Sequence, residues 1–220
     1  DEHTSRGLGD VYKRQGYPIR KNGTRNNISW THIVYRDHWA KKAKLDGFRS
    51  RAVYKIIEID QKVDLFKNVF TILDIGSAPG GWSEYVSKKC PQNNIFAIDL
   101  LDMKPVKNVS FFKADIREID KLKPILGKKG SFDLVISDLA PNITGIGAID
   151  DEAIYEYNTL ILEVALKYSN NKSKFLIKTF QNSYLKKFKS SMEKNFTLVQ
   201  NFKPLASKAT SSEIYLYGEN

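Results

Sequence analysis

Short apolar runs alternate with helix-length segments along most of the chain. Runs of strand type lie at residues 70–75, 94–100, 109–115, 132–138 and 173–180. The segments between them with the length of a helix lie at about 82–89, 117–126, 150–168 and 183–194. This alternation predicts a parallel sheet with helices on both faces. Two last runs, 196–202 and 212–218, are joined by a polar loop without room for a helix, which predicts a closing antiparallel hairpin.

Two further helices are expected before the first strand. One covers about residues 36–45 and ends near Gly47. The other covers 50–60, where Val53, Ile56 and Ile59 contribute to an apolar side. A chain of 220 residues can build one sizeable core. We therefore predict one domain at residues 49–220, preceded by a basic N-terminal extension at 16–48.

Residues 1–15 differ in character from the rest. The stretch "SRGLGDVYKRQ" ends in six residues that match the translation of GAT GTG TAT AAG AGA CAG, a transposon-type sequencing adapter. We interpret residues 1–15 as a disordered sequencing or cloning scar and exclude them from the fold. A natural disordered tail is the alternative.

Composition narrows the function classes. No apolar run approaches the roughly 20 residues of a membrane span. The single cysteine, Cys90, excludes an internal disulfide and suits a reducing compartment, so we expect a cytoplasmic protein. No Cys/His cluster has metal-ligand spacing, and we expect no metal.

Positive charge is concentrated near the N-terminal end. Residues 16–55 hold ten Lys or Arg and two acids, which is +8 of the net +10. Such asymmetry favours a polyanionic partner, with a solvated lysine-rich surface as the alternative.

The stretch "LDIGSAPGGW" (Leu73 to Trp82) follows the first strand, where ligands of such sheets bind. Gly76 and Gly81 have the spacing of a phosphate loop, but Trp82 stands where its lysine belongs. A dinucleotide loop needs glycine where this chain has Ala78, and Pro79 has no N–H to offer an anion. The loop suits a ligand without phosphates.

Two acids end the next strands. Asp99 lies 23 residues after Gly76, where a carboxylate accepts hydrogen bonds from ribose hydroxyls. Asp115 ends the third strand and could accept from the exocyclic amine of adenine. Ribose and adenine without pyrophosphate indicate an adenosine-type cofactor, of which S-adenosylmethionine is the obvious one. Each acid alone could equally be a helix cap or a surface residue.

The sequence resembles the FtsJ/RrmJ family of ribose 2′-O-methyltransferases from about residue 30 to 218. The resemblance is carried, in this order, by "GFRSRAVYKIIEID", "DIGSAPGGWSEYV", "AIDLLDM", "DLVISDLAPNITG", "FLIKTFQ" and "SSEIYLYG". It implies a Rossmann-like α/β methyltransferase fold with a mostly parallel seven-stranded sheet, an antiparallel terminal strand and helices on both faces.

The resemblance also implies site residues. Its catalytic set falls on Lys55, Asp138, Lys178 and Glu213. Its cofactor contacts fall on Gly80, Trp82, Asp99, Asp115 and Asp138, and Gly76 and Gly81 complete the candidate loop. We expect Lys178 to act as the general base, with Lys55 as a nearby second cation. Asp138 would orient the amine, and Glu213 would hold Lys55.

RNA contacts are expected mainly on the basic segment. The candidates for phosphate contacts are Lys41, Lys42, Lys44, Arg49, Arg51 and Lys208. Trp30, Tyr35 and Trp39 could stack on bases, although Trp39 could equally pack against the domain. Asn142 could contact cofactor or RNA, or be a turn residue.

One departure from the family is visible in the loop "SKATSSE". The bacterial rRNA enzymes of the family are typically rich in arginine there, whereas this loop offers only Lys208. Lys186, Lys187 and Lys189 could replace that charge.

The implied function is 2′-O-methylation of a uridine ribose in large-subunit rRNA by a monomer, with no DNA or membrane partner. A tRNA ribose methyltransferase is one alternative. A non-catalytic RNA-binding assembly factor is another, which the intact set of candidate catalytic residues disfavours. Ala78 and Pro79 disfavour a nicotinamide oxidoreductase.

Overall fold

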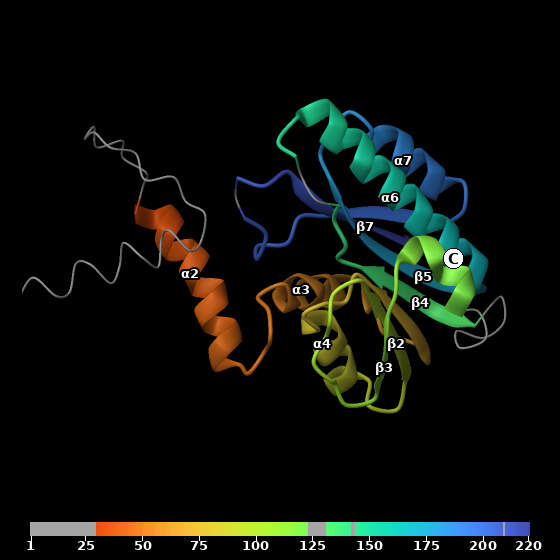
Figure 1. Cartoon of the computed structure of the whole chain (residues 1–220), viewed down its shortest axis with the longest axis horizontal. Coiled ribbons are helices and arrows are strands. Elements are labelled where there is room, and N and C mark those ends of the chain that lie inside the picture. The colour runs from red at the N-terminus through yellow and green to blue at the C-terminus, as the bar shows by residue number, and fades with distance from the viewer. Residues whose placement is uncertain (1–29, 123–130, 142–143, 209) are drawn as a thin grey trace, which may run out of the picture. The chain divides into compact units, whose positions relative to one another are not determined.

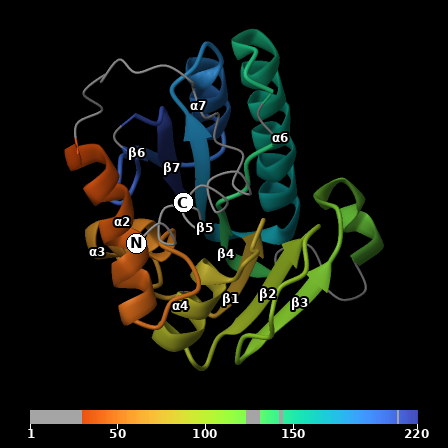
Figure 2. The same ribbon diagram turned by 60° about the vertical axis from the view of Figure 1, so that its left-hand side comes forward.

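Strands β1 to β7 form one twisted sheet in the order β3-β2-β1-β4-β5-β7-β6 (Figures 1 and 2). The strands are β1 (Thr71–Ile75), β2 (Asn94–Asp99), β3 (Val109–Lys113), β4 (Phe132–Ser137), β5 (Ser169–Phe180), β6 (Leu198–Phe202) and β7 (Glu213–Glu219). Strand β7 runs antiparallel to both of its neighbours, and the other pairs are parallel. The predicted hairpin of the last two strands is confirmed, and its second strand lies inside the sheet rather than at its edge.

The computed structural model describes residues 30–122, 131–141, 144–208 and 210–220. The scar interpretation of residues 1–15, the first part of the basic extension and Asn142 therefore lie outside the described residues. Residues 36–220 form one compact unit.

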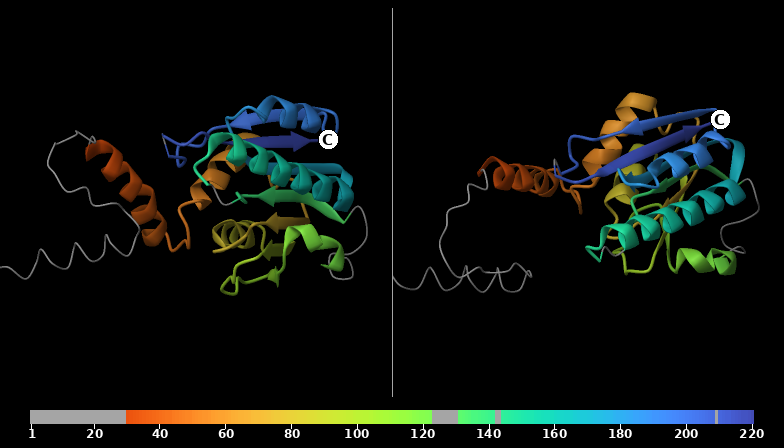
Figure 3. Two further views of the ribbon diagram at one scale, coloured as in Figure 1. Left: turned by 45° about the horizontal axis from the view of Figure 1, so that its top comes forward. Right: turned by 90° about the horizontal axis from the view of Figure 1, so that it is seen from above.

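Helices cover both faces of the sheet, as predicted (Figures 1 and 3). The helices are α2 (Trp30–Leu45), α3 (Val53–Val63), α4 (Gly81–Lys89), the 3-10 helix η1 (Ile116–Leu122), α6 (Gly147–Tyr168) and α7 (Leu185–Glu193). None of these is long and apolar enough to cross a membrane.

Alternation along the strands explains the two faces. Leu73 and Ile75 of β1 pack with buried residues of α6 and α7, whereas Ile72, the residue before Leu73, packs with residues of α3 and α4. Successive side chains of a strand point to opposite faces, so a central strand with apolar residues on both faces fits a sheet covered on both sides.

Some boundaries differ from those predicted. The segment expected to be a helix at 117–126 is a 3-10 helix at Ile116–Leu122, interrupted by non-helical dihedral angles at Glu118. The Asp115 carboxylate accepts the Arg117 backbone N–H at 2.9 Å, which caps the segment locally. Helix α2 begins at Trp30, earlier than expected.

Candidate active site

The candidate catalytic residues come from four elements that meet at one edge of the sheet. Parallel strands β4 and β5 both end there, and Ser137 pairs with Ile177, so Asp138 and Lys178 follow in register. Strand β7 is antiparallel and therefore begins at the same edge, with Glu213 opposite Phe180. Lys55 is added from the first turn of α3.

Two ion pairs link these four side chains. Lys55 Nζ lies 2.8 Å from Glu213 Oε1, and Lys178 Nζ lies 3.1 Å from Asp138 Oδ1. Lys178 also donates to the Asp138 backbone carbonyl. The two lysine side chains are only 9% and 11% exposed. Removing one partner of such a pair leaves a buried charge uncompensated.

Tyr215 connects the two ion pairs and was not predicted. Its hydroxyl donates to Asp138 Oδ1 at 2.6 Å, and Lys55 Nζ lies 5.5 Å from its ring centroid. Burial, with the Asp138 and Glu213 charges, raises its pKa well above the usual value, so the phenol stays protonated and donates. The sequence signal for Tyr215 was its position two residues after Glu213, because strand residues two apart lie on the same face of the sheet.

Glu213 has a second partner in the loop between β6 and β7. Ser207 Oγ donates to Glu213 Oε1 at 2.8 Å. The Glu213 carboxylate therefore has two partners, Lys55 and Ser207, which limits the rotamers open to Glu213 and Lys55.

The glycine loop, Gly76–Gly81, runs close to three other segments. Gly76 has a φ of +74°, and a Cβ there would lie 2.5 Å from Leu139 Cβ. Gly80 has a φ of +102°, and its Cβ would lie 2.9 Å from Met103 Sδ. A Cβ on Gly81 would lie 3.0 Å from Ser50 Cβ. Glycine is needed here both for the backbone conformation and for space.

Asp99 anchors this loop. Its carboxylate accepts the backbone N–H of Ala78 at 2.8 Å and that of Leu101 at 2.8 Å. An ionised carboxylate has further acceptor sites, so its predicted contact with ribose hydroxyls is compatible with both bonds.

Two other predicted cofactor residues have protein partners. The Trp82 indole N–H donates to the Ala52 carbonyl at 2.9 Å, and its ring lies 5.8 Å from that of Tyr215. The Asp115 carboxylate faces Arg117, whose hydrogen bonds lower the pKa of Asp115. Their direct contacts with a cofactor stay predictions.

Asp74 is a second residue that the sequence reasoning missed. It is 1% exposed in β1, and Ser83 Oγ donates to its Oδ2 at 2.5 Å. Burial raises the pKa of Asp74 to about 7, and the Asp138 and Asp99 charges act in the same direction. An acid inside the apolar run "TILDI" was the signal for it.

Two buried polar atoms at this edge have no partner within the described part of the chain, Asp74 Oδ1 and Ser77 Oγ. Buried polar atoms in proteins are nearly always hydrogen-bonded. Together with Asp99 they suit a ligand that carries hydroxyls and positive charge. The residues present therefore fit an adenosyl sulfonium cofactor.

The candidate RNA residues have different surroundings. Lys41, Lys44 and Lys208 are exposed, and Arg51 is half-buried. Lys42 pairs with Asp46 at 2.8 Å. Of the stacking candidates, Trp39 packs on Tyr54 with ring centroids 4.9 Å apart, which favours the packing interpretation. The side chains of Trp30 and Tyr35 are outside the described structure.

The three lysines suggested as replacement charge differ as well. Lys186 is exposed, whereas Lys187 Nζ lies 4.5 Å from the ring centroid of Tyr155. Lys189 lies 3.8 Å from Glu193.

Fold and site together define a Rossmann-like methyltransferase. Residues 48–220 match the model of the FtsJ-like methyltransferase family, and the chain belongs to that family. Its cofactor is S-adenosylmethionine. The predicted family, fold class and cofactor are thereby confirmed.

Individual relatives match most of the chain. Ribosomal RNA large subunit methyltransferase E of Nitrosospira multiformis is 40% identical over 199 residues, covering 89% of this chain and 96% of the relative. The protein of that name from Ehrlichia chaffeensis is 37% identical, covering 88% and 92%. A crystal structure of a putative ribosomal RNA methyltransferase from Plasmodium falciparum has 33% identity and a TM-score of 0.71, covering 79% and 98%.

Proposed function

We propose that the chain methylates the ribose 2′-hydroxyl of a uridine in large-subunit rRNA, with Lys178 as the general base. The observation that carries this proposal is the pair of buried ammonium–carboxylate contacts beside the glycine loop, Lys55–Glu213 and Lys178–Asp138. The relatives called ribosomal RNA large subunit methyltransferase E support rRNA as the substrate.

The chemistry of the site favours an oxygen nucleophile. A ribose hydroxyl needs a base and exact orientation, and a lysine held by a carboxylate can supply both. Methylation of a uracil carbon would need an activated nucleophile such as a thiolate. The single cysteine, Cys90, follows the far end of α4, and burial raises the pKa of its thiol.

Each residue has one task in the proposed reaction. When bound, S-adenosylmethionine supplies a methyl group on a sulfonium sulfur, and the bond from that methyl to sulfur breaks as its bond to the ribose oxygen forms. Lys178 accepts the hydroxyl proton. Asp138 orients Lys178, and Tyr215 holds Asp138 from the other side.

Lys55 would act as the second cation of the site. Glu213 would hold this cation in place and help to hold the ribose.

RNA would approach along the basic segment that leads to Lys55. Lys41, Lys44 and Arg51 would contact phosphates, together with Lys208 from the loop before β7. The basic extension at 16–48 would serve the methyltransferase domain at 49–220 in this way. A 2′-hydroxyl acceptor excludes DNA by its chemistry, and we propose that a monomer acts on the large ribosomal subunit in the cytoplasm.

The test is the transfer of labelled methyl from S-adenosylmethionine to purified large subunits, free rRNA and tRNA, with Lys178→Ala as control. We expect one labelled site in large-subunit rRNA that resists alkaline cleavage and is lost in the variant. Label in tRNA alone would point to the tRNA ribose enzyme. Cofactor binding without label in any RNA would point to the assembly factor.

A further inference from the structure

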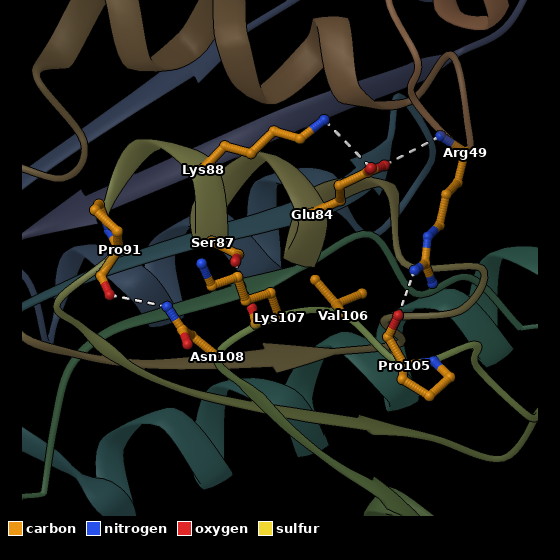
Figure 4. A pocket seen from close by; sticks show the side chains of 9 residues that line it. All are labelled: Arg49, Glu84, Ser87, Lys88, Pro91, Pro105, Val106, Lys107 and Asn108. Atoms are coloured by element: carbon orange, nitrogen blue, oxygen red, sulfur yellow. Dashed lines mark hydrogen bonds and ion pairs between the residues drawn. The ribbon is translucent and has the colours of Figure 1, made fainter.

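The guanidinium of Arg49 is turned toward backbone carbonyls. Its Nη1 donates to the Lys104 carbonyl at 2.5 Å and approaches that of Pro79 at 3.5 Å, and its Nη2 donates to the Pro105 carbonyl at 2.5 Å. Figure 4 shows the side chain closing one end of a groove, reaching from the segment before α3 toward Pro105. A guanidinium has five N–H donors in a rigid fork, which suits several carbonyls at once.

The three carbonyls belong to the two loops that frame the candidate cofactor site. Pro79 lies in the glycine loop, and Lys104 and Pro105 lie in the loop that follows Asp99 at the end of β2. The two loops meet tightly, because a Cβ on Gly80 would lie 2.9 Å from Met103 Sδ and 3.1 Å from Arg49 Nη1. Arg49 is thus placed where the loops touch.

Arg49 is also tied to the helix that begins at the glycine loop. Its backbone N–H donates to Glu84 Oε2 at 3.2 Å, and Glu84 Oε1 pairs with Lys88 at 3.3 Å (Figure 4). The segment that holds Arg49 continues through Arg51 into α3, which bears Lys55. One short segment therefore contacts both cofactor loops and leads into the ion-pair site.

We propose that Arg49 is a positioning residue that holds the two cofactor loops together and couples RNA binding on its segment to cofactor binding. The RNA half of this inference rests on the proposed function. This role is an alternative to the predicted phosphate contact of Arg49, because its guanidinium is turned toward three backbone carbonyls. A lysine could not replace it, since one ammonium has no planar fork.

The first arm of the test needs no RNA. Binding of S-adenosylhomocysteine is measured by calorimetry for the wild type, Arg49→Ala, Arg49→Lys and Lys62→Ala. Lys62 is an exposed cation of α3 that pairs with Glu58, so its loss controls for charge. We expect affinity about tenfold weaker for Arg49→Ala, a partial loss for Arg49→Lys and no change for Lys62→Ala. Thermal melts identify a variant that fails to fold. If Arg49→Ala does not fold, the cofactor affinity of Arg49→Lys decides the test.

The second arm measures RNA affinity at several salt concentrations, with and without saturating S-adenosylhomocysteine. We expect each ligand to strengthen the other by the same factor in the wild type, and this factor to approach one in Arg49→Ala. Unchanged cofactor affinity in Arg49→Ala, with a salt slope lower by about one, would make Arg49 a phosphate contact and overturn the proposal. If the wild type binds no RNA, the proposed function fails, whereas the first arm still decides the role of Arg49 in the cofactor site.

Discussion

The proposed roles of single residues at the site differ in whether the side chain must hold or release a proton. Lys178 must release a proton to act as a base, whereas Tyr215 must keep one to donate to Asp138. Asp74 is a third case, because burial raises its pKa to about 7. The proposed chemistry therefore depends on protonation states that burial and neighbouring charges change. Substitutions that alter the protonation of a side chain, with little change in its charge or size otherwise, test it most directly.

Lys178→Arg keeps the positive charge opposite Asp138 but removes the base, because a guanidinium is not deprotonated in proteins. We expect methyl transfer at neutral pH to fall by at least about 100-fold, with cofactor affinity close to that of the wild type. Single-turnover rates and calorimetry measure the two quantities. Near-normal turnover in this variant would mean that Lys178 only positions the ribose.

Asp74 makes stability depend on pH. Its pKa in the folded chain is about 7 against an ordinary value of 3.8, so the folded state binds its proton more tightly than the unfolded state. The free energy of unfolding should therefore fall as pH rises from about 4 to 7, by up to about 4 kcal/mol.

Asp74→Asn should remove this fall, which urea unfolding at pH 5 and pH 8 measures. Asp133 and Asp150 have lowered pKa values, so their contributions are lost only as pH falls below the ordinary value and do not mask this window. An identical pH dependence in the variant and the wild type would contradict the assignment.

At the scale of elements, strand direction assembles the site. Strands β1, β4 and β5 end at one edge, and β7 brings Glu213 to that edge because it runs the opposite way. The glycine loop then needs room between this edge and its neighbours. Close approach of Gly76 to Leu139 shows how little room is left.

Gly76→Ala should therefore destabilise the chain, by about 2–4 kcal/mol, because its Cβ would meet the backbone and Cβ of Leu139 at a positive φ. Gly147→Ala is a matched control at the start of α6, where a Cβ meets no atom within 4 Å. We expect its effect to stay within about 1 kcal/mol and to be stabilising if present. Equal losses in both variants, measured by chemical denaturation, would contradict this account of the loop.

Strands, helices and loops were predictable from the sequence where a single physical rule determined them. Apolar runs such as 132–138 gave strands because a sheet covered on both sides needs them, and the loop at Gly76–Gly81 followed from backbone geometry. The described part of the helix expected at 117–126 is the 3-10 helix Ile116–Leu122, beside which the Asp115 carboxylate accepts the Arg117 backbone N–H. The pattern of apolar and polar residues carries no information on such a hydrogen bond between a side chain and the backbone.

Site residues divided in the same way. Lys55, Asp138, Lys178 and Glu213 were found through their motifs, and the structure brings them together. Tyr215 and Asp74 were missed because their role depends on tertiary contacts. Arg49 was counted as a phosphate contact on charge alone, and only the fold shows which carbonyls it meets.

At the scale of the whole molecule, we expect charge to decide how RNA is bound. The net charge is +10, and +8 of it lies in residues 16–55. Such a segment binds a polyanion largely by releasing counterions. The segment leads directly to Lys55, so the strongest attraction and the proposed chemistry lie next to each other in the sequence.

RNA affinity should therefore fall steeply with salt. Four phosphate contacts, from Lys41, Lys44, Arg51 and Lys208, give a slope of log affinity against log salt of about −2.8. Lys44→Ala should reduce its magnitude by about 0.7, whereas Lys121→Ala, an exposed cation of η1 paired with Glu118, should not. Filter binding between low and high salt measures both, and a flat response would exclude the basic segment as the RNA contact.

We propose that the chain methylates a ribose oxygen. The most direct measurement is to digest large-subunit rRNA after reaction with the protein and to identify the methylated nucleoside by mass spectrometry. We predict 2′-O-methyluridine as the single new product, formed at least about 100-fold more slowly by Lys178→Arg. A uridine methylated on its base, or a product formed by the variant at the wild-type rate, would contradict the proposal.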